Sequence, residues 1–72
     1  MKNIKEKKLV KEIRNAMNDT STLRFLVLNT IRSEAAALVM RNKISFDFYK
    51  KVFISDTNEH WSEANRDYIL NY

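Results

Sequence analysis

The side chains that could carry chemistry in this chain centre on its single histidine, His60. Glu59 and Glu63 lie close to it at helical spacing, and such a trio could hold a divalent cation weakly through nitrogen and oxygen ligands. No fourth ligand is evident, and this spacing is ordinary on exposed helix faces, so we predict no metal site. A single histidine also leaves histidine-dependent triads and two-histidine metal sites without their residues within one chain.

The composition removes most other catalytic architectures. The chain has no glycine and no cysteine, which excludes glycine-rich phosphate loops, disulfides and thiolate metal sites. Glu63 and Asp67 could pair as an acid and a base, but that chemistry requires one carboxyl to be shifted by burial, and nothing apolar brackets them. We therefore predict that the protein is not an enzyme and uses no cofactor.

Aromatic residues concentrate towards the end of the chain, where residues 46–72 hold seven of the eight. Helical spacing favours core positions for Phe48, Trp61 and Tyr68, but a chain of this size cannot bury all seven rings. Tyr and Trp dominate interface hot spots. We therefore predict a partner-binding surface made of surplus rings and adjacent lysines: Phe46, Tyr49, Lys50, Lys51 and Tyr72. Interleaved with lysines, such rings could also stack on the bases of a single-stranded nucleic acid.

Basic residues offer an alternative surface, since the net charge is +4. Lys7, Lys11 and Arg14 lie along one face of the first predicted helix, and with Lys50 and Lys51 they could contact phosphates. A solvated helix face explains the same pattern more simply. An affinity that falls steeply with salt concentration would favour the nucleic-acid hypothesis over an aromatic protein interface.

The absence of both glycine and proline favours helices, because tight hairpin turns depend on residues that tolerate a positive φ. Polar clusters at residues 18–22, 42–45 and 55–58 divide the chain. They predict four helices over residues 3–18, 21–41, 45–54 and 57–71. Asp56 followed by Glu59 fits the spacing of a capping box and would start the last helix.

The predicted helices differ in how they hide their apolar residues. The first has one apolar stripe that includes Leu9, Val10 and Ile13, whereas the second is apolar around most of its circumference, which is typical of a central helix. The sequence predicts a single all-α domain over residues 1–72, a compact bundle of about four helices around a central, nearly all-apolar second helix. A core this small is marginal, so a homodimer that completes it is a further alternative.

One family resemblance enters through the first two predicted helices. Its residues are the apolar stripe of the first helix, the polar break, and then Leu23, Arg24, Val27, Leu28, Ile31, Arg32, Ser33 and Glu34. With them the stretch Leu9–Leu38 resembles the N-terminal helical hairpin of the YqeY family, whose domain is shared with the tail of the amidotransferase subunit that handles misacylated tRNA. The basic run and the glycine of that family's second half do not appear. The resemblance implies tRNA or translation-associated binding through Arg24, Arg32 and the basic first helix.

We predict a small non-catalytic regulator or adaptor that binds a partner protein. Its compactness and its asparagine- and lysine-rich composition suit a phage or mobile-element product acting on a host protein. The alternative is a module that binds tRNA, RNA or DNA through the first and third helices. Arg24, Arg32 and Glu34 interrupt the longest apolar stretch, which argues against a membrane span. No signal peptide is evident, so we expect the cytoplasm.

Overall fold

The computed structural model describes residues 3–72, and within them it contains five helices and no strand. They are α1 (Ile4–Met17), α2 (Arg24–Met40), α3 (Phe46–Phe53), α4 (Trp61–Ala64) and α5 (Arg66–Asn71). The radius of gyration is 11.5 Å, close to the ~11 Å expected for a compact chain of this length. The predicted all-α bundle is confirmed.

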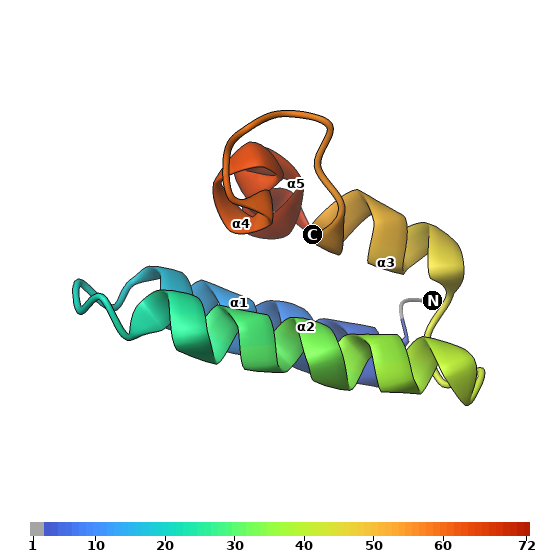
Figure 1. Ribbon diagram of the computed structural model, residues 1–72. Helices are drawn as coiled ribbons and strands as arrows, with labels where there is room; N and C mark the ends of the chain where they lie inside the picture. The colour runs from blue at the N-terminus through green and yellow to red at the C-terminus, as the bar shows by residue number, and fades with distance from the viewer. Residues whose placement is uncertain (1–2) are drawn as a thin grey trace.

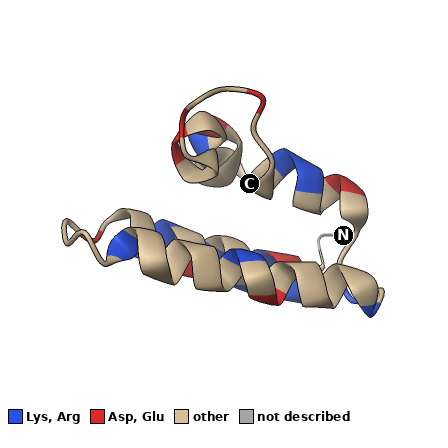
Figure 2. Ribbon diagram, viewed as in Figure 1, with Lys and Arg blue, Asp and Glu red and all other residues tan. Residues whose placement is uncertain are grey.

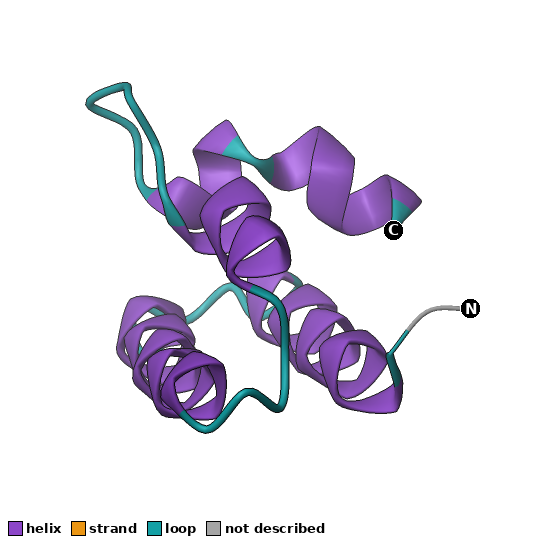
Figure 3. Cartoon of the chain, turned by 90° about the vertical axis from the view of Figure 1, so that its right-hand side faces the viewer, coloured by secondary structure: helices purple, strands orange, loops and turns teal. Residues whose placement is uncertain are grey.

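The helices form two layers. Figure 1 shows α1 and α2 side by side as a hairpin, with α3, α4 and α5 on one side of it, and the turned view in Figure 3 shows the same separation. Between the layers, α1 packs on α5 and α3 packs on α2. Fully buried side chains fill this interface from both sides, among them Ile13, Val52, Phe53 and Ile69.

Asparagines begin α1 and end α2 in this chain, which has no glycine. The Asn3 carboxamide accepts from the backbone N–H groups of Lys5 and Glu6 at the start of α1. Asn42 ends α2 with a positive φ of 59°. Its N–H donates to Val39 O and the N–H of Lys43 donates to Leu38 O, which is the Schellman pattern that normally places glycine at this position.

The last helix differs from the prediction of one helix over residues 57–71. It begins at Trp61 and is broken at Asn65 into α4 and α5. The capping box at Asp56 does not form, because the N-cap is His60, whose ring accepts from the N–H of Ser62. Asn65 turns its carboxamide to donate to Val52 O and Ile54 O at the end of α3. A long-range cap on α3 thus takes the place of a continuous helix.

The second helix is nearly all apolar in sequence but is less central than we expected. Only Leu28, Ile31 and Ala35 of α2 are buried, whereas α1 buries four residues. The reason is the layering, because α3, α4 and α5 cover only one face of the hairpin. Apolar residues on the other face of α2 stay at the surface.

Candidate partner-binding groove

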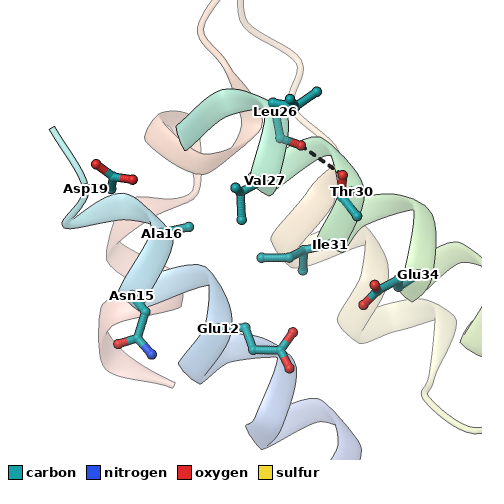
Figure 4. Close-up of a pocket in the computed structure, with 9 residues that line it drawn as sticks. All are labelled: Glu12, Asn15, Ala16, Asp19, Leu26, Val27, Thr30, Ile31 and Glu34. Atoms are coloured by element: carbon teal, nitrogen blue, oxygen red, sulfur yellow. Dashed lines mark hydrogen bonds between the residues drawn. The ribbon is translucent and has the colours of Figure 1, made fainter. Parts of the chain in front are cut away.

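A groove runs between α1 and α2 and is lined by no residue of α3, α4 or α5. Its volume is about 640 Å³, within the range of sites that bind ligands. Figure 4 shows side chains from both helices converging on it. We call it the hairpin groove, and its lining residues are Glu12, Asn15, Ala16, Asp19, Leu26, Val27, Thr30, Ile31 and Glu34.

The floor of the hairpin groove is apolar and open to solvent. Ala16 and Ile31 form its deep part and are buried, while Leu26 is 65% exposed and Val27 is 47% exposed. Leu23, the N-cap residue of α2, is also apolar and is 63% exposed. Neighbouring apolar side chains that stay exposed in this way make the groove a candidate interaction surface.

Carboxylates occupy the rim of the groove. Glu12 of α1 and Glu34 of α2 flank one end, and Asp19 lies in the loop that joins the helices (Figure 4). Within residues 3–72, Glu12 and Glu34 make no hydrogen bond or ion pair, and the single ion pair there joins Lys51 to Asp47. In the described part of the chain, no lysine or arginine lines the groove.

The predicted aromatic surface is only partly assembled. Phe46 is 57% exposed and stacks on Tyr49 with ring centroids 6.4 Å apart, and Lys50 lies over the Phe46 ring. Lys51 turns away to Asp47 and to the ring of Tyr68. Tyr72 is partly buried and packs edge-on against Phe48. The structure thus brings together three of the five residues, and their rings and cation already contact one another.

The predicted nucleic-acid residues do not form one patch. The Arg14 guanidinium donates to Ile69 O and Leu70 O at the end of α5, so its role is internal. Arg24 of α2 lies over the ring of Phe25. Arg32, also on α2, lies near His60, the N-cap of α4. Lys7 and Lys11 are exposed on α1. Figure 2 shows basic residues spread over several helices rather than gathered on one.

His60 is held by polar contacts on both ring nitrogens. Nδ1 accepts from the N–H of Ser62 at 3.2 Å, which assigns the ring proton to Nε2 and makes Nε2 the donor to Asn29 Oδ1 at 3.3 Å. The ring also contacts Phe25 and Trp61. Burial lowers the pKa of His60, an effect that Glu63 opposes and Arg32 reinforces. In the described part of the chain no three acidic or histidine side chains gather into a metal-binding group.

Sequence reasoning missed the hairpin groove, although a signal for it exists. Glu12 and Ala16 follow helical spacing along one edge of α1, Asp19 continues that spacing into the loop, and Val27, Ile31 and Glu34 repeat it on α2. Positions i, i+3, i+4 and i+7 share one helix face. Each stripe contains both apolar and acidic residues, and one short loop joins the two helices. Pairing the helices along these stripes predicts a groove with acidic edges.

Over residues 3–72, no helix combines the length and apolar character needed to cross a membrane. No family model, curated protein or solved structure matches the chain. The resemblance of Leu9–Leu38 to the YqeY hairpin therefore stays a prediction.

Proposed function

We propose that this protein is a non-catalytic protein-binding module, a small regulator or adaptor that receives its partner in the hairpin groove. The observation that carries the proposal is the exposure of Leu26 and Val27 beside the buried floor residue Ile31. Fully burying such a side chain is worth about 1.5–3 kcal/mol. Because Leu26 is 65% exposed and Val27 is 47% exposed, a partner that covers both gains roughly 2–3 kcal/mol of gross binding free energy.

The groove is a better candidate surface than the α3 aromatics. In the predicted aromatic surface, Tyr49 packs on Phe53 and the Tyr72 hydroxyl donates a hydrogen bond to Glu6. A partner that binds these rings would have to displace those contacts. Along the groove, the exposed side chains of Leu26 and Val27 are already presented to solvent on a regular helix. Binding there requires little rearrangement, which favours affinity.

Site-specific photocrosslinking in the producing cell tests the proposal. A benzophenone amino acid at position 26 should give one dominant protein adduct. The matched control places the same group at Lys11, which is exposed on α1 outside the groove, and should not give that adduct. Identical adducts from both positions, or none from position 26, would contradict binding in the groove. An adduct removed by nuclease would support the nucleic-acid alternative.

A further inference from the structure

The charge of the hairpin groove is opposite to that of the chain as a whole. The chain carries a net charge of +4, yet all charged residues that line the groove are acidic: Glu12, Asp19 and Glu34. Their mutual repulsion is unfavourable, and no lysine or arginine among residues 3–72 lines the groove to offset it. Potentials across specific interfaces are complementary. The groove is therefore suited to a cationic occupant.

The carboxylates are available to such an occupant. Glu12 and Glu34 have no hydrogen bond or ion pair within residues 3–72. Asp19 uses Oδ1 to accept from the N–H of Ser21. The two glutamates project from opposite helices towards the same end of the groove (Figure 4). A cation that lies across the groove at this end would meet a carboxylate from each side.

A second copy of the chain fits the groove poorly. A symmetric dimer places the same patch on both subunits, so the carboxylates of one groove would face those of the other. The same repulsion acts against phosphates of a nucleic acid. The apolar floor at Leu26 and Val27 also requires apolar side chains on the occupant, because cationic groups alone would leave this apolar surface exposed to water.

The dimensions indicate a helix. The α2 wall of the groove from Val27 to Glu34 follows one helix face and spans roughly 12 Å at about 1.5 Å per residue. An amphipathic helix laid between two helices presents anchors at i, i+3, i+4 and i+7 over a similar distance. Its flanking basic residues would then fall beside the rim.

We propose that the hairpin groove binds a basic amphipathic helix of a partner protein, with apolar anchors on Leu26 and Val27 and a lysine or arginine between Glu12 and Glu34. This proposal rests on the proposed function and specifies the chemistry of the partner. In this proposal the acidic rim selects a basic partner, and the apolar floor contributes most of the binding free energy.

Synthetic peptides provide the test. One peptide of about 18 residues, long enough to form a helix, carries leucines at i, i+3, i+4 and i+7 and lysines elsewhere on its flanks. A matched peptide has glutamine in place of each lysine. Two-dimensional amide NMR spectra of the full chain should show shifts confined to residues 12–19 and 23–34 with the lysine peptide. The glutamine peptide should bind at least several-fold more weakly.

Variants separate the rim from the rest of the surface. Glu12→Gln with Glu34→Gln should weaken the lysine peptide by roughly 2- to 30-fold, the effect of losing two exposed charge pairs. That loss should shrink in about 0.5 M salt. Asp56→Asn with Glu59→Gln is the matched control, since it removes the same charge from the exposed loop before α4 and should have little effect. The amide spectra of each variant report whether the fold is retained.

The failures are distinguishable. Equal binding of the two peptides in the groove, or equal losses in the two double variants, would overturn the basic-helix proposal and leave the groove as a protein-binding surface. Absence of groove shifts with both peptides, together with no crosslink from position 26, would overturn the proposed function as well. Shifts with the lysine peptide that are confined to the groove and lost in Glu12→Gln with Glu34→Gln would support both.

Discussion

The hydroxyl of Tyr72 donates a 3.1 Å hydrogen bond to Oε1 of Glu6. Oε2 of the same carboxylate accepts from the N–H of Ser45 at 3.0 Å, and Ser45 is the N-cap of α3. One carboxylate of α1 thus joins both the start of α3 and the residue that follows α5. Burial, followed by the hydrogen bond to Glu6, raises the pKa of Tyr72 to about 12.

Tyr72→Phe should lower the free energy of unfolding by about 1 kcal/mol, the net worth of a typical hydrogen bond. The ring contact with Phe48 remains in this variant, so packing is preserved. Urea unfolding followed by the fluorescence of the single tryptophan, Trp61, measures the change. Glu6→Gln and the double variant complete a cycle, and additive effects of the two single changes would show that these groups are not coupled.

The raised pKa of Tyr72 also predicts alkaline sensitivity. A phenol whose folded-state pKa exceeds its ordinary value of 10.0 stabilises the fold below that value and loses its contribution as the pH rises towards 12. The unfolding midpoint in urea should therefore fall above pH 10 in the native chain. The fall should be smaller in Tyr72→Phe, and equal slopes in the two proteins would contradict this assignment.

His60 should make the fold sensitive to mild acid. Its pKa is lowered by burial from 6.5, so the unfolded state binds the proton more readily, and stability is lost as the pH falls below 6.5. Protonation of Nδ1 also removes the acceptor for the N–H of Ser62, and loss of an N-cap costs about 1 kcal/mol. NMR titration of the His60 ring measures the pKa directly. A titration midpoint above 6.5 in the folded protein would refute the assignment.

His60→Asn is the informative variant for this effect. Asparagine is a strong N-cap and does not titrate, so the α4 start is retained while the pH dependence is removed. The native chain should lose stability between about pH 7 and 5, and the variant should lose less over the same interval. Parallel pH profiles would place the acid sensitivity on other groups.

Asn42 holds a left-handed conformation that only glycine adopts without cost. Asn42→Gly should be neutral or stabilising by up to about 1 kcal/mol, because the Cβ is removed while both Schellman hydrogen bonds remain. Asn42→Ala should destabilise by about 1 kcal/mol. Calorimetric melting temperatures of the three proteins should rank glycine first and alanine last. If the alanine variant melts with the native chain, the strain at this position is negligible.

The sequence predicts the helices better than it predicts the surfaces. Lack of glycine and proline indicated an all-α fold, and the polar clusters placed the first three helices within a few residues. The break at Asn65 was not visible in the sequence, because the hydrogen bond that accompanies it joins its carboxamide to Val52 O of another helix, α3. A stretch apolar on all sides, such as α2, is also ambiguous, since periodicity alone does not distinguish a covered face from the exposed face at Leu26 and Val27.

Site residues were harder to predict for the same reason. Glu12 and Glu34 come from different helices, and their shared groove depends on how the hairpin pairs. Arg14 looked like one more cation of a basic stripe, but it donates to backbone carbonyls of α5. The excess of aromatic residues correctly indicated that Phe46 is exposed. Tyr72, expected on the same surface, instead donates a hydrogen bond to Glu6 of the same chain. Residue spacing in the sequence shows which side chains share a helix face. Which residues that face contacts depends on how the helices pack.

The exposed groove residues should be dispensable for folding. Leu26→Gln replaces a side chain that is 65% exposed, and surface substitutions of this kind change the free energy of unfolding by at most about 0.5 kcal/mol. Leu28→Ala, two residues along, empties a position that is 1% exposed and should cost about 2–5 kcal/mol. Urea unfolding of the two variants measures the contrast. A large loss in Leu26→Gln would mean that this leucine supports the fold, and would remove the main argument for a docking surface. The same Leu26→Gln change can be combined with a benzophenone amino acid at position 27. A small loss of stability together with a lost crosslink from position 27 would show that Leu26 contributes to partner binding and not to folding.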